Sequence, residues 1–360
     1  GVSSMTSLGL IGAGMIANIH ADAIKRVGSK IVAVHDPRMS RAEEFGMKHN
    51  CEVLETVDSL LARDDIDGVI VAVPNNMHAE LAIASLKAGK HVLLEKPMAM
   101  NLQQCDEIIS ARDKFGKVLQ MGFVCRYSPA ALRAKKIIES GELGEVLHVQ
   151  ATLLRQRGIP GLGGWFTTKA KSGGGCLIDI GVHLIDLVMC LSSKRSPHRV
   201  YGKCTQMFTT ETYAYDEMWA TPVEDGTFDV EDRVRALLTD VSGTTFEFNV
   251  AWATHLPENI LKDGIIIEGT HGSLVVDLWA DEITRGYSDE GVPKTETISI
   301  DLTEAWEDAF DGEHRAFANA IASGKIDDGA GTGEDGRLVQ SVVEAIYASD
   351  EVGIEIAVAR

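Results

Sequence analysis

The chain has 360 residues, of which 45% are hydrophobic and 24% are charged, and its formal net charge is −19. This length exceeds one typical hydrophobic core and predicts two domains. The acidic balance disfavours nucleic acid and anionic membranes as partners and favours a small molecule. No apolar run approaches the roughly 20 residues of a membrane span, and the first residues, GVSSMTS, lack the parts of a secretory signal. We therefore expect a cytoplasmic protein with no membrane partner.

The six cysteines are scattered and form no C-x-x-C pair. This usage favours reduced, packed thiols over disulfides or a cysteine metal cage.

The first 120 residues alternate expected strands and helices. The expected strands are 8–11, 31–35, 51–54, 68–73, 91–94 and 118–121, and the helices between them include 39–50, 77–88 and 101–115. Strands separated by helices predict a doubly wound parallel sheet of the Rossmann type, which we assign to residues 5–124. Ligands of such sheets lie beyond the carboxyl ends of the strands.

The turn after the first strand has the pattern Gly12-x-Gly14-x-x-Ala17. In a dinucleotide fingerprint the first glycine permits the tight turn, the second lets the backbone approach a pyrophosphate, and the small third residue lets helix and strand pack closely. Met15 and Ile16 would begin the helix whose free N–H groups meet the phosphates.

Asp36 ends the second strand, 22 residues after Gly14. A carboxylate there binds the ribose hydroxyls and repels a 2′-phosphate, which predicts NAD. Arg38 is a reservation, because an arginine can accommodate that phosphate, so NADP stays possible.

The pattern changes over residues 125–360, where a helix at 129–140 precedes long alternating strands. The expected strands are 146–155, 233–240, 244–252, 264–268, 273–277 and 295–300, and two helices, 303–323 and 334–351, close the chain. This predicts an α+β domain with a large open, mainly antiparallel sheet, and its closing helices could pack back toward the first domain. Apolar residues of the strands, Val250, Trp252, Ile265 and Ile267, suggest a face covered in a homodimer or homotetramer.

The stretch DIGVHLID places Asp179, His183 and Asp186 on one face of a helix expected from about residue 177. Buried ionisable groups need partners or a function. The alternatives are a satisfied core histidine beside an aspartate, or a metal pair. No third and fourth ligand are apparent nearby, so we predict no metal.

Lys96 follows an expected strand on the ligand side of the sheet, just before Pro97. Alone it could be a solvated surface lysine. Oxidation of a hydroxyl by hydride transfer needs a proton acceptor and a group that steadies the oxyanion. His183 suits the first role, Lys96 the second, and Asp179 could orient His183.

The connection 158–175 is long and glycine-rich. Such loops are usually functional, so we favour a substrate-covering loop over a plain surface excursion. Trp165 lies within it, and Arg155 and Arg157 precede it.

Three stretches together are highly specific: GLIGAGMIA near the start, the segment from Val71 to Pro97 that ends in Glu-Lys-Pro, and DIGVHLID. With them the chain resembles the glucose–fructose oxidoreductase/inositol dehydrogenase family, also written Gfo/Idh/MocA, over nearly its whole length. The resemblance implies an NAD(P)-dependent dehydrogenase of a cyclic polyol or sugar, of the inositol or glycoside type. It also implies an open sheet that is commonly used for oligomerisation.

The resemblance implies catalytic roles for Lys96, Asp179 and His183. It implies cofactor contacts from Pro74, Asn75, His78, Glu95 and Lys96, and substrate contacts from Arg126, Arg155, Arg157, Trp165, Asp179 and His183. Two alternatives stay open: an NAD-dependent glycosidase of the same family, which the sequence separates poorly, and a cofactor-binding regulator without catalysis.

Overall fold

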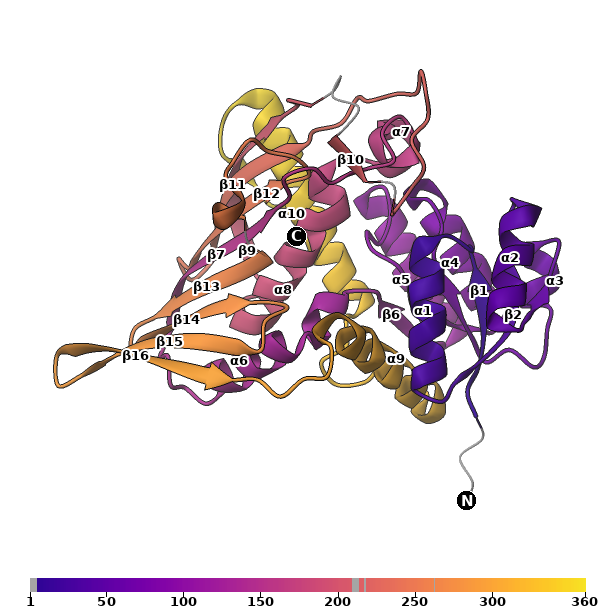
Figure 1. Cartoon of the computed structure of the whole chain (residues 1–360), viewed down its shortest axis with the longest axis horizontal. Helices are drawn as coiled ribbons and strands as arrows, with labels where there is room; N and C mark the ends of the chain where they lie inside the picture. Colours follow the sequence, from indigo (N-terminus) through magenta and orange to yellow (C-terminus); the bar gives the residue numbers. More distant parts are fainter. Residues whose placement is uncertain (1–4, 209–213, 217, 262) are drawn as a thin grey trace. The chain divides into compact units, whose positions relative to one another are not determined.

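The computed structural model describes residues 5–208, 214–216, 218–261 and 263–360. They form two compact units, each drawn in Figure 1. The first unit comprises the chain up to Phe123 together with Phe310–Arg337, and the second comprises Val124–Ala309 and Leu338–Arg360.

The first unit is built on a six-stranded sheet with the order β3-β2-β1-β4-β5-β6, and every neighbouring pair is parallel. The strands are β1 Ser7–Ile11, β2 Lys30–His35, β3 Glu52–Val53, β4 Gly68–Val71, β5 His91–Leu94 and β6 Leu119–Met121. This is the doubly wound order, which reverses between β1 and β4. The predicted Rossmann sheet is therefore confirmed.

Helices connect these strands: α1 Met15–Arg26, α2 Met39–His49, α3 Val57–Leu61, α4 His78–Lys87 and α5 Leu102–Phe115. Local signals set their ends. The side chain of Thr56 accepts the N–H of Ser59 at the start of α3, and that of Asn101 accepts the N–H of Gln104 at the start of α5. Each bond satisfies a backbone donor that the first helical turn leaves without a partner.

The core of the first unit includes a residue from near the end of the chain. Phe317, on α9 (Ala305–Ser323), is fully buried in one cluster with Leu8, Leu10 and Ile70. A side chain on Gly68 would lie only 3.1 Å from its ring. The segment from Phe310 onward is thus part of this unit's core.

The second unit contains a nine-stranded sheet with the order β16-β15-β14-β13-β7-β12-β11-β9-β17. Its strands are β7 Val146–Leu154, β9 Pro197–Thr205, β11 Arg233–Asp240, β12 Thr245–Ala251, β13 Asp263–Gly269, β14 Gly272–Asp277, β15 Glu282–Asp289, β16 Val292–Ser299 and β17 Ile356–Ala357. Only the pair β7 and β12 is parallel among these neighbours. The predicted mainly antiparallel sheet is confirmed, although the sequence reading omitted β9, β15 and β17.

One face of this sheet is covered by α6 (Pro129–Glu139) and α8 (Val182–Ser192), as Figure 1 shows. The four apolar residues assigned above to an open face, Val250, Trp252, Ile265 and Ile267, are at most 1% exposed. That assignment was wrong, because strand alternation directs them into the core of their own chain. Exposed apolar residues such as Tyr201, Leu237 and Val275 lie elsewhere on these strands.

The remaining elements include a second, two-stranded sheet and two more helices. The strands β8 Ile159–Pro160 and β10 Tyr215–Asp216 form a short parallel pair, α7 comprises Lys169–Ser172, and α10, Gly333–Val352, begins in the first unit and continues into the second. The segment Lys169–Ser192 is long and apolar enough to cross a membrane by length and composition, but 89% of its most apolar window is buried inside the protein. A core helix passes the same test.

We expect Phe317→Ala to destabilise the first unit by about 3–5 kcal/mol, because it removes a fully buried ring and leaves a cavity. Phe115→Ala is the matched control, since Phe115 is partly exposed at the end of α5. Urea unfolding of both variants measures the free energies. Equal losses for the two variants would contradict the placement of Phe317 in this core.

Candidate active site

The turn at Gly12 leaves no room for a side chain. Its φ is +103°, and a Cβ there would lie 2.0 Å from the carbonyl oxygen of Ala72. Gly14 is different: a Cβ would meet only the Arg41 guanidinium, at 3.9 Å. Gly14 is also the N-cap of α1 and supplies no side-chain cap to the first N–H groups, which begin at Met15 and Ile16. This helix end is open to an anion.

The Asp36 carboxylate fixes the same turn. It is 6% exposed, and its oxygens accept the backbone N–H groups of Ala13, at 2.9 Å, and Arg38, at 2.8 Å. The Arg38 side chain is exposed at the start of α2. The close turn at Gly12, the uncapped start of α1 and the Asp36 carboxylate after β2 together fit the binding of a dinucleotide. Contact of Asp36 with ribose hydroxyls stays a prediction.

Glu95 and Lys96 follow β5, at the same carboxyl edge of the sheet. One Glu95 oxygen lies 2.6 Å from Nε2 of His20, and the other accepts the Lys96 N–H at 3.2 Å. Glu95 is therefore nearly buried and held by His20, and its contact with a cofactor stays a prediction, whereas Lys96 is partly exposed. The Lys96–Pro97 peptide bond is cis.

His78 holds the chain on the other side of Lys96. It is fully buried, with Nδ1 2.6 Å from the carbonyl oxygen of Pro97 and Nε2 3.0 Å from that of Val73. Burial lowers its pKa, and this outweighs the two carbonyl oxygens, which raise it. The geometry makes His78 a positioning residue.

Two further predicted cofactor residues lie beside His78. Asn75 is 5% exposed and begins the short helix Asn75–Met77, and Pro74 precedes it at the carboxyl edge of β4. Cofactor contacts of His78, Asn75 and Pro74 stay predictions.

Asp179 and His183 lie in the second unit, on one continuous helical segment. Residues Leu177–Gly181 form a π-helix that leads into α8, where an α-helix was expected. The Asp179 carboxylate accepts the indole N–H of Trp252 at 2.8 Å, and Trp252 is fully buried. Both Asp179 and His183 are partly exposed. The structure thus gives Asp179 a rigid anchor and leaves His183 accessible.

Glu231 anchors the start of this helical segment, and the sequence analysis missed it. Its carboxylate accepts the N–H of Gly175 at 2.9 Å and the hydroxyl proton of Tyr347. Burial raises the pKa of Glu231, and the Tyr347 hydrogen bond opposes that shift. A Cβ on Gly175 would lie 1.9 Å from the Glu231 carbonyl oxygen, and one on Gly174 would lie 2.0 Å from the Tyr347 hydroxyl oxygen, so close packing requires glycine at both positions.

Asp186 does not share a functional face with Asp179. It is 2% exposed and pairs with Arg126 through two hydrogen bonds of 2.6 and 2.7 Å. Asp186 is thus held inside the second unit by the buried guanidinium of Arg126, whereas Asp179 and His183 are partly exposed. This geometry gives Arg126 a structural role, and its contact with substrate stays a prediction.

The long connection before α7 is well anchored. Trp165 stacks on Phe166 with 3.8 Å between ring centroids, and the Thr167 hydroxyl donates to the Thr227 carbonyl oxygen at 2.7 Å. Arg157 donates to the carbonyl oxygen of Thr254 at 2.8 Å and covers the ring of Phe208. Burial raises the pKa of Asp263, and the positive charge of Arg155 opposes that shift. Substrate contacts of these three predicted residues remain proposals.

Comparison with known proteins identifies the family. Residues 6–123 match the oxidoreductase family with an NAD-binding Rossmann fold, GFO_IDH_MocA, and residues 131–275 match the GFO/IDH/MocA C-terminal domain. The chain belongs to the Gfo/Idh/MocA family. It is 29% identical to D-glucoside 3-dehydrogenase of Escherichia coli (strain K12), over 98% of this chain and 99% of that protein. Glucose-6-phosphate 3-dehydrogenase of Bacillus subtilis (strain 168) is 34% identical over 52% of this chain and 54% of that protein.

Solved structures show the same fold. A levoglucosan dehydrogenase in complex with NADH and levoglucosan has a TM-score of 0.87 and 23% identity, covering 99% of this chain and 100% of that one. This Gfo/Idh/MocA protein is accordingly an oxidoreductase with an NAD-binding Rossmann domain. When bound, the nicotinamide supplies the hydride acceptor.

We expect Gly12→Ala to weaken NADH binding at least about tenfold, because its Cβ would displace the carbonyl of Ala72 and open the turn. Gly28→Ala is the matched control: Gly28 also has a positive φ, +81°, but a Cβ there meets nothing within 4 Å. NADH fluorescence titration measures both affinities. Similar dissociation constants for the two variants would contradict a role of the close approach at Gly12 in NADH binding.

Proposed function

We propose that this protein is an NAD-dependent dehydrogenase that oxidises a secondary hydroxyl of a sugar or cyclic polyol, of the glycoside or inositol type, in the cytoplasm. The observation that carries the proposal is the partly exposed Lys96 at the carboxyl edge that also presents Gly12 and Gly14. A lysine at the dinucleotide edge of the sheet is suited to chemistry beside a nicotinamide. The full-length similarity to D-glucoside 3-dehydrogenase supports a glycoside as the substrate.

In this proposal His183 accepts the hydroxyl proton and Lys96 stabilises the negative charge that develops on the oxygen. Asp179 orients His183, and the indole of Trp252 holds Asp179 in place. The Asp36 carboxylate makes NAD preferable to NADP, since it repels a 2′-phosphate.

The experiment is a screen of glycosides, hexoses and inositols with NAD and with NADP, followed by the absorbance of the reduced cofactor. We expect stoichiometric reduction of NAD by one class of these substrates. Parallel incubation with aryl glycosides separates the glycosidase alternative, because net aglycone release without net NADH points to glycosidic bond cleavage. No turnover in either assay, with NADH binding intact, favours the regulator.

Lys96→Ala and His183→Ala should lower kcat by about 10²–10⁴-fold while NADH still binds, because both groups act mainly in the transition state. Asp179→Asn should lie between these variants and the wild type, since it orients and does not transfer a proton. Steady-state kinetics and NADH titration provide the two readouts. A folded His183→Ala protein with turnover within about threefold of wild type would refute the proton-transfer role.

We further propose a homodimer or homotetramer that uses the sheet face opposite α6 and α8. A cross-strand row on that face joins Tyr201, Leu237, Glu247, Gln150 and Ile266 through successive register pairs. Tyr201 and Leu237 are nearly half exposed, at 48% and 47%. Exposed apolar side chains among polar ones are typical of an interface between like chains.

Light scattering should give a mass that is two or four times the chain mass of 38.9 kDa. We expect Leu237→Glu to shift the mass toward the monomer, because it places a charge in the row, whereas Val241→Glu in the adjoining turn should not. A wild-type monomer at micromolar concentration would contradict this assembly.

A further inference from the structure

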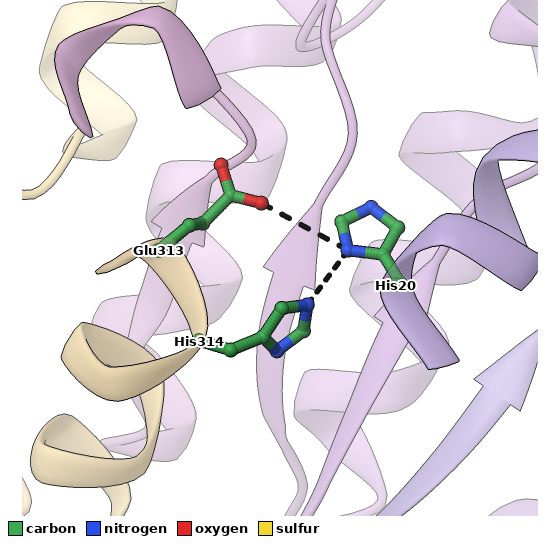
Figure 2. Close-up of side chains that lie close together, drawn as sticks. All are labelled: His20, Glu313 and His314. Carbon is green, nitrogen blue, oxygen red and sulfur yellow. Dashed lines mark hydrogen bonds and ion pairs between the residues drawn. The ribbon is translucent and has the colours of Figure 1, made fainter. Parts of the chain in front are cut away.

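A cluster of metal-ligating side chains lies inside the first unit, and it contacts Glu95 through His20. Figure 2 shows His20, on α1, facing Glu313 and His314, on α9. One ligand atom from each of the three lies within 4.8 Å of the others, and all three side chains are buried. Nδ1 of His20 is 2.7 Å from Nε2 of His314 and 3.8 Å from a Glu313 oxygen.

Glu313 is the residue that needs an explanation. It is fully buried, and neither carboxylate oxygen has a hydrogen-bond partner among the described residues. Among the described residues its ion-pair partner is the His20 ring, at 3.8 Å, and Nδ1 of that ring is already within hydrogen-bond distance of His314. An ionised carboxylate in such a place is strongly unfavourable unless a cation or a proton accompanies it.

The far side of His20 has the arrangement found around metal-bound histidines. Its Nε2 lies 2.6 Å from a Glu95 oxygen, so an N–H on Nε2 leaves the Nδ1 lone pair directed at His314 and Glu313. A carboxylate that accepts the second N–H fixes the tautomer of a metal-ligating histidine and strengthens it as a ligand. Glu95 is 7% exposed, so this carboxylate is itself nearly buried.

The charges also balance around one divalent ion. Glu95 and Glu313 bring two negative charges, and the two imidazoles bind metals in their neutral form. A single M²⁺ ion therefore matches the charge of the two carboxylates, both of which contact His20.

We propose that His20 Nδ1, His314 Nε2 and one Glu313 oxygen form a binding site for a divalent transition metal, with zinc as the best match. Two imidazoles and one carboxylate are a common zinc donor set. Tetrahedral ligands about 2.0–2.1 Å from zinc are about 3.3 Å apart, so the two rings must separate by roughly half an ångström when the ion enters. The ion replaces the His20–His314 hydrogen bond and links α1 to α9.

A proton on Glu313 is the competing occupant. Burial raises the pKa of the Glu313 carboxyl, and the charge of Glu95 raises it further.

The site could not be predicted from the sequence, since His20 and His314 are separated by 294 positions. It does not rest on the proposed function, because none of its ligands has a role in the proposed proton transfer.

The test is the metal content of the whole purified chain after growth or incubation with zinc and removal of free metal, measured by mass spectrometry. We expect about one zinc per chain for the wild type, and less than about a tenth for His314→Gln and Glu313→Gln. His49→Gln is the matched control, because His49 is a buried histidine of the same unit outside the cluster. It should retain the zinc.

Two measurements on the wild type keep the test decisive if a variant fails to fold. Cobalt substitution should give the visible absorption bands of tetrahedral Co²⁺, and removing the metal with a chelator should lower the melting temperature by at least about 3 °C. Wild type that binds less than about a tenth of an equivalent of zinc, cobalt, nickel or manganese, with an unchanged melting temperature, overturns the site in favour of a protonated Glu313. Full metal content in folded His314→Gln also overturns it.

Discussion

The close approach of two strand ends is the constraint on which the first unit depends. At Gly12 the chain leaves β1 against the carbonyl of Ala72, which follows β4, and a Cβ would be 2.0 Å from that oxygen. These are the strands between which the sheet order reverses. Because the turn can be no wider, α1 begins at Met15 with its N–H groups at the carboxyl edge, which is the geometry that a pyrophosphate requires. The same helix then carries His20 into the interior.

Much of this fold could be predicted because its signals are local. The spacing of Gly12, Gly14 and Ala17, the apolar runs, and the break after each run are properties of neighbouring residues, and they located the six parallel strands. The strands β9 and β15 were not predicted, because polar or glycine positions interrupt their apolar pattern. What makes β9 a strand is its register with β11, in which Tyr201 opposes Leu237. That pairing is tertiary, and single-strand preferences depend on such context.

The sequence predicted which polar residues lie near the candidate site, but it did not predict which partner each side chain contacts. Glu95 and Arg126 were expected to touch ligands, which stays a prediction, and each is buried against a partner that its own sequence neighbourhood does not reveal. For Arg126 the partner is Asp186, 60 positions away, and for Glu95 it is His20, 75 positions away. A buried polar group requires a hydrogen-bond partner, but the fold alone decides which group supplies it. Sequence reasoning therefore identifies polar residues near a site more readily than it separates those that bind from those that support.

The supporting residues explain how a partly exposed side chain can be held ready for chemistry. Lys96 lies between two anchored neighbours, since Glu95 is fixed by His20 and Pro97 by His78. In the second unit, Asp179 is fixed by the indole of Trp252, and the glycines before its helix are fixed by Glu231. In both places buried groups immobilise the backbone or the carboxylate. The conformational entropy of these groups is therefore lost during folding and not when substrate binds. It follows that the buried partners, which touch no reacting atom in the proposed reaction, influence turnover through geometry.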